Sequence, residues 1–152
     1  METYLTKGAA TVDVESGVDY FGLVLASIGD PVAVAERGRD AGAELGPDFA
    51  EAVAAIADRV LTAVRAADPD VLVGTPVGGM RLIDYLPTRT FELTVHTCDL
   101  AGALGQPLEV PESAGLQSLE LVAGLAARAG QVGALLHAAT GRRNLPAAFT
   151  VL

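Results

Sequence analysis

Apolar residues recur at intervals of three and four along most of the chain, the period that places them on one face of an α-helix. The clearest run begins after Asp48, which forms a capping-box pattern with Glu51. Charged residues occupy the opposite face of this run, and Asp68-Pro69-Asp70 closes it. The pattern therefore predicts a well-defined amphipathic helix, whose apolar positions are Phe49, Val53, Ile56, Val60 and Val64.

The same spacing predicts further helices, bounded by proline, glycine and capping residues. They are expected at 16–28, at 31–45 with Asp30 as N-cap, at 84–104 with Asp84 as N-cap and Pro87 in the first turn, after Pro111, and at 131–140. Residues 2–10 are interpreted as the tail of a helix.

Two short apolar runs, at 71–73 and 80–82, flank glycine-rich turn material and predict a β-hairpin. Two strands alone are marginally stable in water, so this hairpin is expected to lie against a helix. No internal repeat, low-complexity stretch or linker divides the sequence. The predicted fold class is all-α with a minor β-hairpin, in a single domain covering residues 1–152.

Composition narrows the class of protein. Hydrophobic residues make up 51% of the chain, and the formal net charge is −9. This charge argues against a nucleic-acid partner and against adsorption to an anionic membrane. No apolar run has the length of a membrane span, and the N-terminus lacks the features of a signal peptide. Because the single cysteine, Cys98, cannot form an internal disulfide, we expect a cytoplasmic protein.

A polar stripe follows the helix predicted at 84–104. It contains residues spaced by three or four, which lie on one face of a helix: Tyr85, Arg89, Glu92, His96 and Asp99. The pattern alone leaves open whether this stripe faces water or an internal polar cleft. A buried glutamate and histidine would be costly unless they were paired or bound to a metal.

Glu92 and His96 are the residues of this stripe with the clearest metal chemistry. Standing four apart on a helix, they can offer a carboxylate oxygen and an imidazole nitrogen to one divalent cation. A third protein ligand and a water molecule would complete a catalytic zinc-type centre. Such a metal lowers the pKa of a bound water or thiol and so creates a nucleophile at neutral pH.

A resemblance to a known family rests on the same helix. The mycothiol-dependent maleylpyruvate isomerases carry a signature helix that is similar to FELTVHTCDLA at 91–101, followed by ALG at 103–105. Other parts of their domain resemble TPVGG at 75–79, TGRRNLP at 140–146 and FTVL at 149–152. The likeness runs from roughly residue 30 to the C-terminus. Because the family belongs to the DinB-like metal-binding proteins, the resemblance implies a four-helix bundle.

The resemblance also implies a divalent metal, usually zinc, held by three side chains in the bundle core, with Glu92 and His96 as two of them. Family members use this metal to activate a low-molecular-weight thiol, mycothiol, for isomerisation or thiol transfer. Their third ligand is a histidine on an earlier helix, but no histidine precedes His96 here. We therefore expect the family's first helix to be missing, and Asp99, His137 or a group from another subunit to complete the site.

Other candidates have simpler interpretations. His137 and Asp99 fit helix-end and local hydrogen-bonding roles, and Cys98 fits a small buried apolar residue. Four arginines suit solvated charge and helix-end complementation more than the binding of a carboxylate substrate: Arg37, Arg39, Arg142 and Arg143. The glycines at 74, 78 and 79 lack the Lys-Ser/Thr of a phosphate loop and are interpreted as turn residues.

Three hypotheses follow. The first is a metal- and thiol-dependent isomerase or transferase acting on a small molecule, with Glu92 and His96 as metal ligands. The second is a non-catalytic relative that serves as a helical binding or dimerisation domain. The third is a truncated reading frame whose upstream helix carries the missing histidine. A bundle without one helix would expose an apolar face, so we also expect a homo-oligomer.

Overall fold

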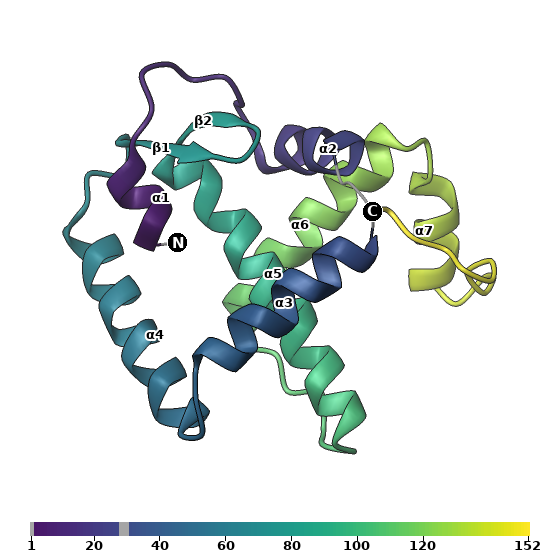
Figure 1. The fold of residues 1–152 in the computed structure, drawn as a ribbon. Helices are drawn as coiled ribbons and strands as arrows, with labels where there is room; N and C mark the ends of the chain where they lie inside the picture. The colour runs from purple at the N-terminus through teal and green to yellow at the C-terminus, as the bar shows by residue number, and fades with distance from the viewer. Residues whose placement is uncertain (1, 28–30) are drawn as a thin grey trace. The chain divides into compact units, whose positions relative to one another are not determined.

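The computed structural model describes residues 2–27 and 31–152, which are mostly helical (Figure 1). The elements in chain order are α1 (Glu2–Lys7), α2 (Gly17–Ser27), α3 (Pro31–Glu44), α4 (Phe49–Ala66), β1 (Leu72–Thr75), β2 (Gly78–Arg81), α5 (Leu82–Ala103), α6 (Glu112–Arg128) and α7 (Val132–Ala139). The predicted fold class, all-α with a minor hairpin, is confirmed. The predicted N-cap Asp30 lies outside the described residues.

The structure corrects one detail at the start of each of two predicted helices. Helix α5 begins at Leu82, so Asp84 lies in its first turn and Pro87 lies inside the helix. The reason is that β2 runs directly into α5, and the Leu82 amide donates to the Val71 carbonyl at 2.9 Å. Helix α4 forms as predicted, but the Asp48 side chain makes no capping hydrogen bond, so the predicted capping box is absent.

Contacts divide the chain into two compact units, which are described separately. One contains the described residues of Met1–Glu15 and Gly22–Leu82, and the other contains Ser16–Phe21 and Ile83–Leu152. The single domain expected from the sequence stays a prediction. No single helix of the described residues is long and apolar enough to cross a bilayer; α2 and 32–44 reach that length and composition only when taken together.

The hairpin is the centre of the first unit. Strands β1 and β2 pair antiparallel, with Val73 opposite Met80, and both side chains are fully buried. Helix α1 packs against β1 and also contacts α4, as Figure 1 shows. The expectation that the hairpin leans on a helix is therefore confirmed.

The segment that follows α1 lies along the hairpin through its glycines. The backbone amide of Asp13 donates to the Gly79 carbonyl at 2.8 Å, and the Gly79 amide donates to the Asp13 carboxylate at 2.8 Å. A Cβ atom on Gly79 would collide with the Thr11 carbonyl, and one on Gly74 with the Gly8 carbonyl. The turn interpretation thus holds for Gly78, which has φ +125, whereas Gly74 and Gly79 allow a close approach of the backbone.

The same contacts act on the Asp13 carboxyl group. Its pKa is lowered from 3.8 chiefly by the hydrogen bond from the Gly79 amide and then by the one from the Thr11 hydroxyl. Both donors favour the ionised carboxylate.

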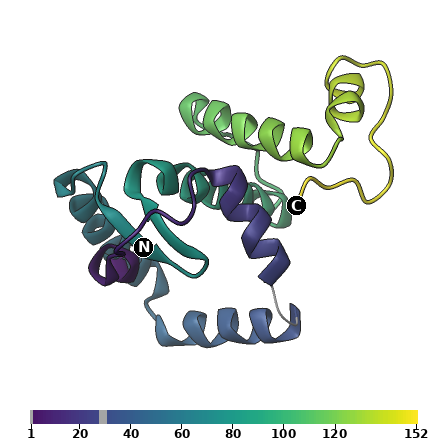
Figure 2. The same cartoon turned by 90° about the horizontal axis from the view of Figure 1, so that it is seen from above.

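The second unit packs the start of α2 against α5 and α6. The Tyr20 ring meets the Tyr85 ring edge-on at 5.5 Å, and Phe21 meets Phe91 at 5.3 Å. Ser16 caps α2 by accepting the Asp19 amide at 3.1 Å. After α7 the chain continues without helix or strand to the C-terminus (Figure 2). In the N-terminal half of α5, Tyr85, Thr88 and Phe91 are buried.

Candidate metal centre

The polar stripe of α5 carries every residue that the sequence assigned to a metal site. Along this face the side chains pass from buried to exposed: Tyr85 is buried, Arg89 and Glu92 are half-buried, and His96 and Asp99 are exposed. The change follows from the packing of α2, whose Tyr20 covers only the N-terminal half of the helix. The sequence left open whether the stripe faces water or an internal polar cleft. Its C-terminal end faces solvent, whereas Tyr85 at its N-terminal end is packed in the core.

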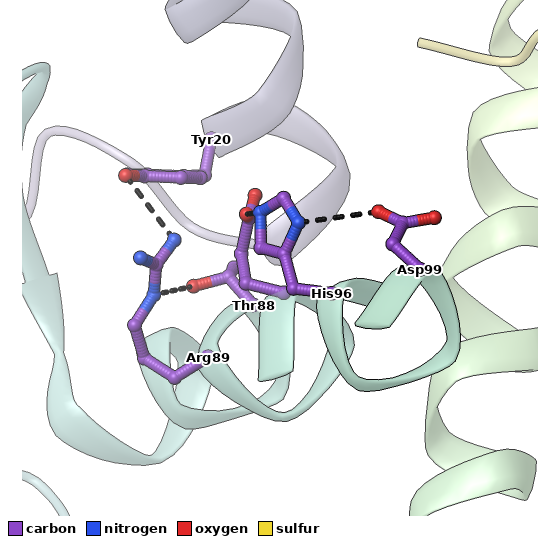
Figure 3. Close-up of polar contacts among 6 residues, drawn as sticks. Tyr20, Thr88, Arg89, His96 and Asp99 are labelled. Atoms are coloured by element: carbon purple, nitrogen blue, oxygen red, sulfur yellow. Dashed lines mark hydrogen bonds and ion pairs between the residues drawn. The ribbon is translucent and has the colours of Figure 1, made fainter. Parts of the chain in front are cut away.

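His96 lies between two carboxylates. Its Nε2 atom is 3.2 Å from Glu92 Oε2. Its Nδ1 atom is 3.4 Å from Asp99 Oδ2, and Figure 3 shows this contact as a dashed line. In the tautomer with the proton on Nδ1, Asp99 accepts that hydrogen bond, and the Nε2 lone pair is left on the side of Glu92. A carboxylate that orients a histidine through its second nitrogen is the usual support of a metal-binding imidazole.

The two atoms that face each other fit a shared cation. Two ligand atoms at tetrahedral positions, each about 2.0–2.1 Å from a zinc ion, lie about 3.3 Å apart. The observed separation of 3.2 Å between Glu92 Oε2 and His96 Nε2 matches this value. Asp99 contacts the other ring nitrogen, a position suited to orienting His96 rather than to binding the same ion.

The pair offers only part of a coordination sphere, and it is open to solvent. The exposed fractions of the side chains are 35% for Glu92, 70% for His96 and 69% for Asp99. Within residues 2–27 and 31–152, no group of three or more His, Cys, Asp and Glu side chains is arranged to hold a metal ion. A third ligand would therefore have to come from outside the described residues of this chain.

The remaining candidates lie elsewhere. His137 is exposed in the last turn of α7, where its carbonyl accepts the backbone amides of Arg142 and Arg143 at 2.8 and 3.2 Å. The end of α7 is thus satisfied by backbone amides, and both arginine side chains are exposed, as are those of Arg37 and Arg39. Cys98 is half-buried and free.

Sequence reasoning placed Arg89 in the stripe but gave it no role. In the structure its guanidinium carbon lies 4.9 Å from the centre of the Tyr85 ring and 5.5 Å from that of the Tyr20 ring. Its Nε atom donates to the Thr88 hydroxyl at 3.1 Å. Tyr20 stands 69 residues earlier in the chain, so no local pattern could have indicated this cluster.

A groove of about 460 Å³ lies on a different face of α5. Residues of α5, of the loop before α6 and of α6 form its mainly apolar lining. They are Thr90, Leu93, Thr94, Thr97, Glu109, Val110, Pro111 and Ala114. Neither Glu92 nor His96 belongs to this lining, so the groove is separate from the candidate metal centre.

One comparison with known proteins identifies a family. The family model described as the mycothiol maleylpyruvate isomerase N-terminal domain matches residues 7–101, well over half of the chain. The match includes Glu92, His96 and Asp99 and agrees with the DinB-like all-α fold class predicted from the sequence. No curated protein and no solved structure matches the chain.

The matched range corrects one detail of the resemblance. It begins at residue 7, so the expectation that the first thirty residues fall outside the likeness is wrong. It ends at residue 101, and the similarity of the C-terminal segments at 140–146 and 149–152 stays a prediction.

Proposed function

Because the chain belongs to the family of mycothiol maleylpyruvate isomerase N-terminal domains, we propose that it binds a divalent metal, zinc, through Glu92 and His96. The proposed activity is a thiol-dependent isomerisation or transfer on a small molecule, with mycothiol as the cosubstrate. A cytoplasmic location and a homo-oligomeric state belong to the same proposal.

The observation that carries the proposal is the separation of 3.2 Å between Glu92 Oε2 and His96 Nε2. It is supported by the position of Asp99, whose carboxylate can accept the Nδ1 proton in the tautomer whose Nε2 binds a cation. Glu92 is also left available, because the guanidinium of Arg89, one turn earlier, is engaged by Thr88 and Tyr20 instead.

Each residue has a defined part in this proposal. Glu92 and His96 bind the cation, and Asp99 holds the imidazole ring in its orientation. When bound, the metal would lower the pKa of a coordinated thiol and supply a thiolate near neutral pH. The exposure of His96 leaves room for a third ligand from a second subunit.

Zinc binding by the purified metal-free protein tests the proposal. Titration against a chromophoric chelator is expected to give about one equivalent of zinc per chain, because a single Glu92–His96 pair is present. His96→Ala and Glu92→Gln should each remove this binding, and His137→Ala is the matched control that should retain it. A wild-type protein that takes up no zinc, or equal losses in His96→Ala and His137→Ala, would contradict the proposal.

A second candidate function is a helical binding or dimerisation domain without catalysis. The observation that favours it is the exposure of His96, with no third ligand among the residues that the structure describes. One result separates the two functions. If the wild-type protein binds no zinc, and His96→Ala self-associates as well as the wild type, the second function is supported.

A further inference from the structure

The groove of about 460 Å³ beside α5 has two sides of different chemistry. The α5 side carries three threonines, whose spacing by four and three places them along one face of the helix: Thr90, Thr94 and Thr97. The other side is apolar and contains Val110, Pro111 and Ala114. From the rise of a helix, the threonines extend about 10 Å along α5. The groove therefore fits a short, elongated ligand with an apolar body, which would also cover the exposed side chain of Leu93.

Most polar groups of this groove have no partner. The Thr90 hydroxyl donates to the Leu86 carbonyl at 3.4 Å, whereas the hydroxyls of Thr94 and Thr97 make no hydrogen bond to any described residue. The Glu109 carboxylate likewise forms no ion pair or hydrogen bond within residues 2–27 and 31–152. A mainly apolar groove with a few available polar groups is typical of a site for a small organic ligand.

The charges around the groove are predominantly negative. Residues 90–127, which include the whole lining, contain no lysine or arginine but five acidic residues: Glu92, Asp99, Glu109, Glu112 and Glu120. Of the lining residues, only Glu109 is charged. The positive end of the α6 dipole would favour an anion, but Glu112 in the first turn of α6 offsets it. The field at the groove therefore attracts a cation and repels a carboxylate.

We propose that this groove binds a small organic amine. The apolar body of the amine lies between α5 and the apolar side of the groove, and its ammonium group donates to the Glu109 carboxylate. An ammonium group has three donors, so the hydroxyls of Thr94 and Thr97 are further acceptors for it. The groove lies within the second unit and does not include Glu92 or His96. The inference is therefore independent of the proposed metal centre.

Titration of the metal-free protein with hexylamine tests the inference, with hexanol and hexanoate as probes that differ in the head group. In ¹⁵N-labelled protein at constant ionic strength, the backbone amide signals of Glu109, Val110 and Ala114 should shift with hexylamine. Glu109→Gln should weaken hexylamine binding by about 3- to 5-fold, as expected for one exposed ion pair, and should leave hexanol binding unchanged. Glu120→Gln removes an exposed carboxylate of α6 outside the lining, so this control should bind hexylamine like the wild type.

A second variant tests the groove itself. Ala114→Leu fills the groove from a half-buried helical position, so it should weaken the binding of both hexylamine and hexanol while its backbone spectrum stays folded. The inference is overturned if hexanol or hexanoate binds as tightly as hexylamine, if Glu109→Gln binds hexylamine like the wild type, or if the shifts lie at acidic residues outside the groove. Shifts of the groove amides with protein concentration alone would place a second copy in the groove and would also overturn it.

Discussion

His96 contacts one carboxylate on each ring nitrogen, and these two contacts have different consequences. The contact with Glu92 places two metal-capable atoms side by side, whereas the contact with Asp99 sets the orientation of the imidazole ring. The groups on this face therefore differ in what their removal should do. Loss of Glu92 removes a proposed metal ligand, whereas loss of Asp99 only removes the group that orients the proposed ligand His96.

Asp99→Asn should weaken zinc binding by about 10-fold without abolishing it. Replacing the carboxylate behind a metal-binding histidine typically costs 10- to 100-fold in affinity, and the exposure of Asp99 puts the effect at the lower end. The chelator titration measures this value. Affinity equal to that of the wild type would contradict the orienting role, and complete loss would make Asp99 a ligand.

Asp19 gives a pH dependence of stability. Its pKa is lowered from 3.8, first because the Ser16 hydroxyl donates to the carboxylate at 2.6 Å and then because Arg128 does so at 2.8 Å. Since the folded state favours the ionised form, this stabilisation is present above pH 3.8, the unfolded value, and is lost as the pH falls through the lower folded value.

Asp19→Asn should therefore lower the free energy of unfolding by about 0.5–1 kcal/mol at pH 7, a value limited by the exposure of the ion pair. In urea unfolding between pH 7 and pH 3, the difference in the free energy of unfolding between Asp19→Asn and the wild type should become smaller below pH 3.8. Glu120→Gln on the exposed side of α6 is the control. A difference that stays constant to pH 3 would show that Asp19 does not act through its charge.

At the scale of elements, the helices and the hairpin could be predicted because their apolar period is local information. The exact start of α5 could not, since it depends on contacts that spacing does not encode. Helix α5 begins at Leu82 because the hairpin feeds into it, and the Asp48 side chain does not cap α4. The close approach at Gly74 and Gly79 was also missed, because it requires residues 8–13 to cross the hairpin.

Replacement of glycine by alanine should change the free energy of unfolding in opposite directions at two positions. Gly79→Ala places a methyl group against the Thr11 carbonyl, so it should destabilise the fold by about 1–3 kcal/mol. Gly102→Ala in α5 meets no atom within 4 Å and should stabilise by about 0.5–1 kcal/mol, because alanine favours the helix. Chemical denaturation compares the two variants. A neutral Gly79→Ala would mean that the 8–13 segment does not need to lie against the hairpin.

At the scale of the whole molecule, the composition indicated a helical protein, and the family match places it among mycothiol maleylpyruvate isomerase N-terminal domains. The spacing of Glu92 and His96 could be predicted from the sequence, but their exposure could not, because it depends on which part of α5 packs against Tyr20 and Phe21. The Arg89 cluster was equally hidden, since Tyr20 reaches it only through the tertiary fold.

Zinc should promote self-association if a second copy supplies the third ligand. In sedimentation velocity at micromolar concentration, the metal-free protein is expected to shift toward a dimer when zinc is added, and His96→Ala should show no shift. A mass that stays monomeric with zinc bound would contradict a shared site. The third ligand would then have to be solvent or the thiol itself.

The central claim is that Glu92 and His96 hold one cation between Oε2 and Nε2, and imidazole NMR tests it most directly. The chain has only two histidines, so a ¹⁵N-histidine-labelled sample gives two ring systems that His137→Ala separates. On addition of zinc, the Nε2 signal of His96 should move to the position of a metal-bound nitrogen while Nδ1 keeps its proton toward Asp99. A His96 ring whose nitrogen signals do not respond to zinc would contradict the account.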